Sequence, residues 1–258
     1  MSCPVIENRQ IVAIRVDATS YRQAADQIIV WAGRKESRYV CAAPVSTVME
    51  AYDDQTLQRM INNADMVTPD GMPLVWSLKM LGVPLATRVY GPDLTLAVLE
   101  GAARHDIAVG LFGGSQEVAA LFGRRMGERF PGLRIVFNYS PPFRPLTEEE
   151  DARVVGEIRR SGAQIILVGL GNPKQERWMA LHKDSIPAVL LGVGAAFDFL
   201  AGTKPQAPRW LMQCGLEWVF RLMTEPRRLW KRYLKHNPRF VVLLVMQLLG
   251  FRRARKLA

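Results

Sequence analysis

Cysteine is scarce in this sequence: Cys3, Cys41 and Cys214 are the three cysteines of a 258-residue chain, and they lie far apart. Their number is odd and they form no Cys-x-x-Cys pair, which argues against a disulfide framework and against a cysteine-based metal site. We therefore expect reduced cysteines in a cytoplasmic protein. The first ten residues, MSCPVIENRQ, contain no apolar core of the kind that signal peptides have, so we expect no secretory leader.

Long apolar runs are also missing. The longest covers residues 240–250, contains Gln247, and is shorter than the roughly 20 residues that a membrane-spanning helix needs. The three histidines, His105, His182 and His236, have no partner pattern, so no histidine-based mechanism is indicated. GxSxG, HExxH and a convincing Asp-x-Asp at a strand end are absent too. Any phosphate charge on a substrate would then be met by Arg, Lys and helix N-termini rather than by a metal ion.

The positive charge is concentrated at the C-terminal end. The net charge is +10, yet residues 204–258 alone contain thirteen Lys and Arg against two Glu, a balance of +11. The other 203 residues contain 21 basic and 22 acidic residues, a balance of −1. Pro205 and Pro208 mark this change in composition. The chain therefore divides into a neutral domain over residues 1–203 and a basic segment over residues 204–258.

Apolar, β-branched segments alternate with helical patterns through the first domain. The predicted strands cover residues 11–16, 39–43, 65–68, 107–112, 134–138, 165–168 and 189–193. These segments lack polar alternation, so both faces should be buried, as in a parallel sheet with helices on both faces. Predicted helices include 47–62, 73–81, 93–105, one beginning at a Thr147–Glu150 capping box, and, in the basic segment, 210–223, 227–236 and 240–250. The fold class is therefore α/β.

Asp70 lies at the end of a predicted strand, in Thr68-Pro69-Asp70-Gly71. Proline restricts the φ angle of residue 69 and glycine permits a wide range of φ at residue 71, so we expect the Asp70 carboxylate to be held on a tight turn. There it could act as a general base toward a substrate hydroxyl group. The alternative is an aspartate that only hydrogen-bonds to its own turn.

Two glycine-containing segments follow predicted strands and begin helices. Residues 113–115 (GGS) suit a phosphate or diphosphate through backbone N–H groups, although the segment is neither a full GxGxxG nor a Walker A motif, and a simple tight turn is the alternative. Residues 169–176 (GLGNPKQE) put Lys174 and Gln175 in the first turn of a helix. A cation there opposes the helix dipole, so an anionic ligand explains it better than local stability; the alternative is a solvated polar face.

Two further residues are candidates for ligand contacts. Arg88 precedes a helix N-terminus, in residues 88–93 (RVYGPD), and arginine suits bidentate contact with phosphate; a plain surface arginine is the alternative. Asp198 lies among apolar residues and could bind a ribose or sugar hydroxyl or cap a turn.

The basic segment interleaves cations with aromatic residues, a pattern that favours a nucleic acid or a membrane surface as partner. An ordinary packed helical cap is the alternative. The residues are Arg221, Arg227, Arg228, Lys231, Arg232 and Lys235 among Trp210, Trp218, Phe220, Trp230 and Tyr233.

Taken together, these segments resemble the WecG/TagA/CpsF glycosyltransferase family (glycosyltransferase family 26). The similarity covers residues 11–234 and rests on several long motifs in the same order. They are residues 63–73 (NADMVTPDGMP), 88–94 (RVYGPDL), 169–176 (GLGNPKQE), 192–198 (GVGAAFD), 207–210 (APRW) and 215–218 (GLEW).

The resemblance implies an inverting, metal-independent glycosyltransferase with a Rossmann-like α/β fold and no cofactor. It implies a UDP-sugar donor, a sugar acceptor on a polyprenyl diphosphate, and a peripheral place on the cytoplasmic face of the inner membrane, in exopolysaccharide or cell-envelope polysaccharide biosynthesis. Residues 1–203 would then be the catalytic domain, and residues 204–258 a basic helical membrane-associating appendage. We expect no nucleic-acid partner, and the sequence leaves a homo-oligomer open.

By matching position, Asp70 looks like the family's general base, and Arg88 and Gln175 look like its active-site partners. The appendage arginines would close over the donor diphosphate on the membrane. The residues that we assign to donor or diphosphate binding are Thr68, Gly71, Gly113, Gly114, Gly171, Asn172, Lys174, Glu176, Asp198, Arg221 and Arg228. Those that we assign to membrane binding are Arg227, Trp230, Lys231, Arg232 and Lys235.

One loop departs from the family pattern. After the second strand the family usually has an asparagine, whereas Pro44 stands at that place here, without an N–H or an amide side chain. The donor sugar is therefore not transferable from another member. Two other function classes stay open at this point. They are a dinucleotide-dependent oxidoreductase, against which the incomplete GxGxxG counts, and a nucleic-acid-binding protein acting through the basic segment.

Overall fold

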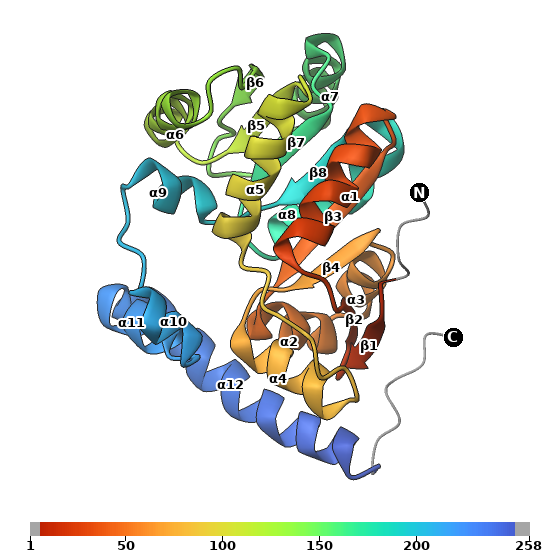
Figure 1. Cartoon of the computed structure of the whole chain (residues 1–258), viewed down its shortest axis with the longest axis vertical. Coiled ribbons are helices and arrows are strands. Elements are labelled where there is room, and N and C mark those ends of the chain that lie inside the picture. The colour runs from red at the N-terminus through yellow and green to blue at the C-terminus, as the bar shows by residue number, and fades with distance from the viewer. Residues whose placement is uncertain (1–5, 251–258) are drawn as a thin grey trace. The chain divides into compact units, whose positions relative to one another are not determined.

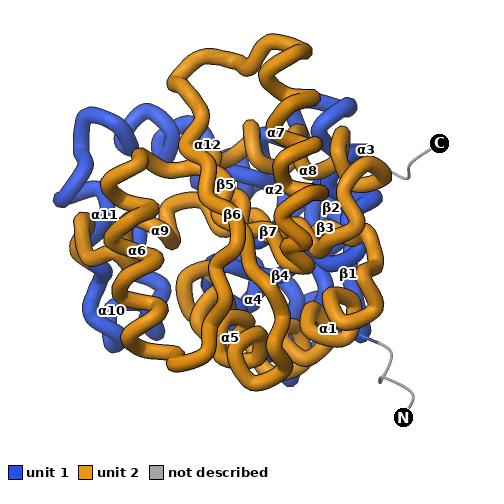
Figure 2. Tube along the Cα trace, turned by 90° about the horizontal axis from the view of Figure 1, so that it is seen from above, with its two compact units in different colours: residues 1–20, 42–90, 206–258 blue, residues 21–41, 91–205 orange. Residues whose placement is uncertain are grey.

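The computed structural model describes residues 6–250, so Cys3 lies outside the described part. Internal contacts divide the chain into two compact units (Figure 2): unit 1 contains residues 1–20, 42–90 and 206–258, and unit 2 contains residues 21–41 and 91–205. The chain passes from unit 2 to unit 1 between residues 205 and 206, close to the composition change. The basic segment thus packs with N-terminal segments, and its role as an appendage stays a prediction.

A six-stranded sheet with the order β4-β3-β8-β7-β5-β6 confirms the predicted α/β class (Figure 1). The pairings of β3 with β8, β8 with β7, β7 with β5 and β5 with β6 are all parallel. The strands are β3 (Arg38–Ala43), β4 (Met66–Pro69), β5 (Val109–Gly113), β6 (Ile135–Tyr139), β7 (Ile165–Gly169) and β8 (Val189–Gly192). Because β6 is an edge strand, its residues alternate between exposed and half-buried, whereas β5 and β8 are wholly buried.

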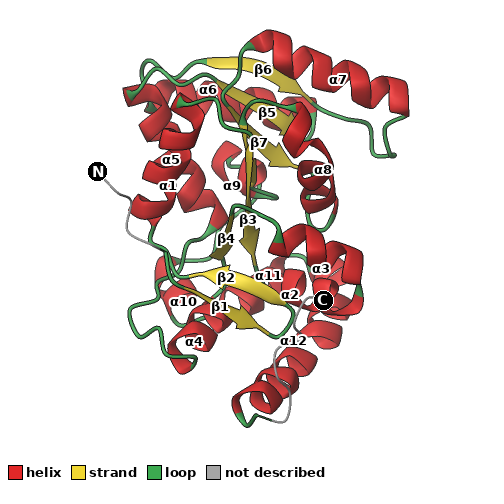
Figure 3. Cartoon of the chain, turned by 90° about the vertical axis from the view of Figure 1, so that its right-hand side faces the viewer, coloured by secondary structure: helices red, strands yellow, loops and turns green. Residues whose placement is uncertain are grey.

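Helices cover both faces of the strands in unit 2, as predicted. Figure 3 shows α1 and α5 on one side of the strands and α8 on the other. The helices of this unit are α1 (Tyr21–Gly33), α5 (Gly91–Arg104), α6 (Gln116–Arg129), α7 (Glu148–Ser161), α8 (Lys174–His182) and α9 (Ala196–Ala201), with a 3-10 turn η1 (Lys183–Ser185). Helix α5 begins at Gly91, two residues before the predicted start at Asp93, so Asp93 lies in its first turn.

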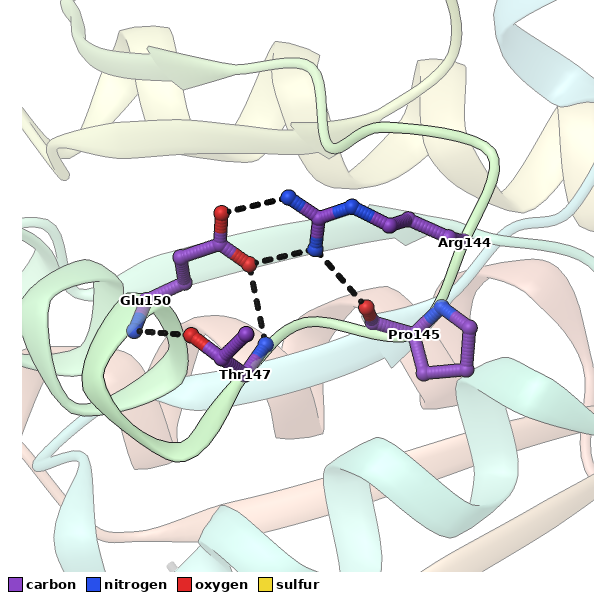
Figure 4. Close-up of polar contacts among 4 residues, drawn as sticks. All are labelled: Arg144, Pro145, Thr147 and Glu150. Carbon is purple, nitrogen blue, oxygen red and sulfur yellow. Dashed lines mark hydrogen bonds and ion pairs between the residues drawn. The ribbon is translucent and has the colours of Figure 1, made fainter.

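The predicted capping box at the start of α7 is confirmed. Thr147 Oγ1 accepts a hydrogen bond from the Glu150 backbone N–H, and the Glu150 carboxylate accepts one from the Thr147 N–H (Figure 4). Arg144 pairs with both carboxylate oxygens of Glu150, at 2.6 and 2.7 Å. The Arg144 guanidinium, helped by the Thr147 N–H, lowers the pKa of Glu150 to about 2. The loop before α7 is therefore tied to the helix by charge-assisted hydrogen bonds.

Unit 1 begins with a hairpin where a single strand over residues 11–16 was predicted. Strands β1 (Asn8–Ile11) and β2 (Ile14–Asp17) pair antiparallel. The chain reverses at Val12, with φ +54°, and the Ala13 N–H bonds to the Ile11 carbonyl. Since the turn residues are as buried as the strands, the apolar run continues through the turn and hides it from sequence analysis.

The helices of unit 1 are α2 (Val45–Asp53), α3 (Gln55–Asn62), α4 (Met72–Met80), α10 (Arg209–Gln213), α11 (Glu217–Thr224) and α12 (Pro226–Leu248). The prediction of a single helix over residues 47–62 was wrong. Asp54 breaks it, because its carboxylate accepts from the N–H groups of Thr56 and Leu57 and caps α3.

The predicted helices of the basic segment differ from the observed ones in two ways. The helix over residues 210–223 is interrupted at Gly215, whose φ is +73°. Residues 227–236 and 240–250 were predicted as two helices, but residues 227–248 belong to the single helix α12, which contains Pro238 and ends at Leu248. Helix α12 packs on α2 and buries Phe240 and Leu244, and this packing offsets the hydrogen bond that proline removes.

Candidate active site

Asp70 follows β4 directly and precedes α4. Its backbone N–H donates to the Ala43 carbonyl at 3.2 Å, which ties it to the end of β3. Gly71 is the N-cap of α4 with φ −107°, an ordinary extended conformation, so the expected tight turn with a freed φ angle is wrong. The start of the helix holds this segment instead, and the positive end of a helix dipole favours a carboxylate there.

Arg88 is held against Asp70 from a neighbouring segment. Its Nε donates to the Asp70 backbone carbonyl. The Val89 N–H donates to the Pro69 carbonyl at 3.0 Å, which fixes the two segments side by side. The Arg88 guanidinium lies over the ring of Tyr90, 4.3 Å from its centroid. Asp70 and Arg88 occur in separate motifs of the sequence, the resemblance predicts them as active-site partners, and in the structure they are in contact.

Glu217 completes this cluster and was missed as a site residue. Its Oε2 accepts from Nη2 of Arg88, and its Oε1 lies 3.9 Å from Nη1 of Arg221. The three side chains are mostly buried, with exposed fractions of 15% for Arg88, 13% for Glu217 and 23% for Arg221. Glu217 lies in the GLEW motif, and that motif was the one sign in the sequence that pointed to it. The sequence could not show that Glu217 and Arg88, 129 positions apart, are in contact.

The charges of this cluster shift the pKa values of Arg88 and Tyr90. Burial works to lower the pKa of Arg88, but the negative charges of Asp70 and Glu217 outweigh it and raise that pKa. Burial raises the pKa of Tyr90 strongly, and the same two carboxylates add to the effect. Arg88 is therefore a permanent cation and Tyr90 a neutral phenol, so the cluster offers a fixed positive charge beside a carboxylate.

A second cluster lies in unit 2, around Gln175 in the first turn of α8. The Gln175 side chain is 3% exposed; its Oε1 accepts from the Gly194 N–H at 3.0 Å and its Nε2 donates to Glu176 at 3.1 Å. A Cβ atom at Gly192 would lie 3.0 Å from Gln175 Nε2 and 2.8 Å from Met179 Cε. Glycine at the end of β8 therefore makes room for the glutamine.

The glycines after β5 have a structural reason of their own. Gly113 has φ +127°, and a Cβ there would lie 2.6 Å from the backbone of Gly169. Gly114 also has a positive φ angle, +67°, and its backbone N–H donates to the Gly169 carbonyl at 3.3 Å. Ser115 caps α6 by accepting from the Val118 N–H. These contacts require the glycines whether or not a phosphate binds, so the predicted diphosphate contact stays a prediction.

The other predicted donor-binding residues of unit 2 are spread around these turns. Lys174 is exposed in the first turn of α8, as the sequence predicted. Asn172 is half-buried and Gly171 has φ +77°. Asp198 lies in the first turn of α9, and its carboxylate is 3.8 Å from Lys204 Nζ. Their roles with a ligand stay predictions.

Three predicted donor-binding residues are buried or ion-paired in this structure, and their contacts with a donor stay predictions. Thr68 and Glu176 are fully buried. Within the described residues, Thr68 Oγ1 makes no hydrogen bond. Arg228 pairs with Glu225 at 2.8 Å on the first turn of α12. A direct contact of Thr68 or Glu176 with a donor would need a local rearrangement.

The predicted membrane-binding residues occupy the first half of α12. Arg227, Trp230, Lys231 and Lys235 are exposed, and Arg232 is half-buried. The helix and its C-cap residue add an exposed apolar stripe to which the sequence gave no such role: Leu234, Val241, Val242, Val245, Leu248 and Leu249. None of the helices within residues 6–250 has the length and apolar character needed to cross a bilayer. That part of the chain also contains no group of three or more His, Cys, Asp or Glu side chains arranged to hold a metal ion.

Comparisons with known proteins show the family to which this chain belongs. The model of the glycosyl transferase WecG/TagA/CpsF family matches residues 9–254. An N-acetylglucosaminyldiphosphoundecaprenol N-acetyl-beta-D-mannosaminyltransferase of Bacillus spizizenii is 30% identical over 209 residues, covering 81% of this chain and 79% of its own. The enzyme of the same name from Staphylococcus aureus is 28% identical over 236 residues, covering 90% of this chain and 89% of its own. From the match over nearly the whole chain and the named relatives, this chain belongs to the WecG/TagA/CpsF family and is a glycosyltransferase.

Proposed function

We propose that this glycosyltransferase moves a sugar from a UDP-sugar, with inversion and without a metal ion, to a sugar carried on a polyprenyl diphosphate. The observation that carries the proposal is the cluster in which Arg88 binds the Asp70 carbonyl and joins Arg221 through Glu217. The names of the relatives, which describe a diphosphoundecaprenol acceptor, support the acceptor class.

The proposed reaction is a single displacement. Asp70 takes the proton from the acceptor hydroxyl as that oxygen attacks the anomeric carbon, and the bond from this carbon to UDP breaks. A positioned base of this kind contributes typically 10²–10⁴-fold. UDP leaves with increased negative charge on its diphosphate. Arg88 and Arg221 are cations that could meet this charge, and fixed cations in a partly buried site do so strongly.

We further propose peripheral attachment through α12, at the cytoplasmic face of the inner membrane. This helix combines exposed cations in its first half with an exposed apolar stripe that lies mainly in its second half. An anionic bilayer surface attracts each cation near it by about 1 kcal/mol and can bury the apolar stripe at its interface. Attachment would bring the enzyme to an acceptor that is itself anchored by a lipid.

The direct experiment measures UDP release from a panel of UDP-sugars, with a polyprenyl-diphosphate-linked sugar in liposomes, with and without EDTA. We expect one donor to give acceptor-dependent release that EDTA leaves unchanged. NMR of the early product should show the anomeric configuration opposite to that of the donor. Release that EDTA abolishes, or a product that retains the configuration, would contradict the mechanism. No release with any donor would contradict the proposal as a whole.

A further inference from the structure

We propose that Glu217 is a positioning residue: it holds Arg88 and Arg221 on one carboxylate and thereby links α11 to the segment that carries Asp70. The inference rests on the proposed function, because it takes Arg88 and Arg221 as the cations that meet the donor diphosphate.

The contacts of Glu217 use both of its carboxylate oxygens. Oε2 accepts from Arg88, which lies 129 positions earlier in the chain, and Oε1 lies 3.9 Å from Arg221, one turn later on α11. The Glu217 side chain is 13% exposed, so little water competes for these oxygens. A charged pair in such surroundings is more strongly coupled than one on the open surface.

The charge balance explains why a carboxylate is needed at this position. Arg88 and Arg221 would repel each other in a partly buried site, and like charges held close disfavour each other's charged state. One carboxylate between them lowers the net charge of the three groups to +1. With the negative charge of Asp70 beside Arg88 the four groups are neutral overall, and Glu217 keeps both guanidinium groups in a fixed place where they can meet a diphosphate.

Arg88 transmits the effect of Glu217 to the proposed base. Its position is defined by three contacts: the Asp70 carbonyl, the Tyr90 ring and Glu217. The first two come from residues close to Arg88 in unit 1, and Glu217 is the contact that comes from the C-terminal part of the chain. Loss of its charge should therefore loosen Arg88 beside Asp70 and release Arg221 as well.

Glu217→Gln tests the proposal, because it keeps the shape and removes the charge. A matched control is Glu157→Gln on α7, where Glu157 pairs with Arg153 at the same i,i+4 spacing and the same 3.9 Å. For each variant, UDP binding is measured by calorimetry without acceptor, kcat and KM for the UDP-sugar are measured by UDP release, and thermal melting is recorded. We expect Glu217→Gln to lower kcat/KM at least tenfold and to weaken UDP binding, whereas Glu157→Gln should match the wild type.

A double-mutant cycle separates positioning from general stability. If Glu217 acts by holding Arg221, then Arg221→Gln and Glu217→Gln together should cost kcat/KM much less than the product of the single losses. Glu217→Asp, which keeps the charge on a shorter side chain, carries the same test if Glu217→Gln does not fold, and should lose several-fold in kcat/KM. Folded variants with wild-type kcat/KM and UDP affinity would overturn the inference alone. A wild-type enzyme without UDP-sugar turnover would overturn the proposed function with it.

Discussion

The two compact units differ in how many large apolar side chains they expose and in how their candidate site residues are held. Of the nineteen large apolar side chains that are exposed in residues 6–250, fourteen belong to unit 1 and five to unit 2. Unit 1 also holds the Asp70–Arg88–Glu217–Arg221 cluster, in which the Arg88–Glu217 ion pair joins two segments that are far apart in the chain. Unit 2 holds Gln175 through backbone contacts and a glycine at a strand end. Unit 1 thus combines exposed apolar side chains with a buried cluster of charges, whereas unit 2 relies on close backbone packing.

Asp70→Asn removes the proposed base from unit 1 and should have the largest effect. We expect turnover to fall by about 10²–10⁴-fold, because the amide cannot accept the acceptor's proton. Steady-state UDP release measures the loss, and circular dichroism with thermal melting checks that the fold persists. Asp106→Asn, at an exposed aspartate of unit 2 that pairs with Arg134, is the control and should leave turnover unchanged. An active Asp70→Asn enzyme would remove Asp70 from the proposed role.

The apolar stripe of α12 can be tested against a matched residue of unit 2. Leu234 on α12 is 68% exposed and Leu181 on α8 is 67% exposed. We expect Leu234→Ser with Val241→Ser to weaken binding to anionic vesicles by roughly tenfold or more, because each buried aliphatic side chain contributes about 1.5–3 kcal/mol. Vesicle sedimentation measures binding. Equal losses for Leu181→Ser and the α12 variant would show that exposed apolar area alone, rather than α12, decides attachment.

Gly192→Ala tests whether close packing in unit 2 matters for the reaction. The new Cβ would press on Met179 and Gln175, and overpacking of this kind costs about 1–3 kcal/mol. Since Gln175 must shift, we expect kcat/KM to fall roughly tenfold, with a lower melting temperature. Gly127→Ala in α6, where nothing lies within 4 Å of the new Cβ, should keep activity and stability or raise stability slightly. Unchanged kinetics in Gly192→Ala would count against a role for Gln175.

Replacement of Asp53 in unit 1 should have the smallest effect on stability, and this effect should depend on pH. It pairs with Arg239 and Lys235 on α12, and hydrogen bonds from Arg239 lower its pKa to about 2 from its usual 3.8. The stabilisation is complete above the unfolded pKa and is lost as the pH falls through about 2. Asp53→Asn should therefore lower stability by about 1 kcal/mol or less at pH 7.

Thermal melting of wild type and Asp53→Asn between pH 7 and pH 2 checks this expectation. The difference between the two should shrink as the pH falls below about 4 and be small by pH 2, because about half of the folded wild type then carries an uncharged Asp53. Asp26→Asn, at an exposed residue that pairs with Arg22, is the control. A difference that stays constant over the whole range would show that the Asp53 charge does not hold α12.

Sequence alone determined the parallel α/β sheet, because buried strands leave long β-branched runs and helices leave capping signals such as Thr147 and Glu150. It also identified Asp70, Arg88 and Gln175 as candidates, since each lies in a distinctive local motif. Tertiary structure decided the hairpin at Val12, the break at Asp54 and the continuity of α12 through Pro238, where packing and local hydrogen bonds override the apolar pattern. It alone placed Glu217 between Arg88 and Arg221, because contacts between residues far apart in the chain are fixed by the folding of whole segments and leave no periodic trace in the sequence.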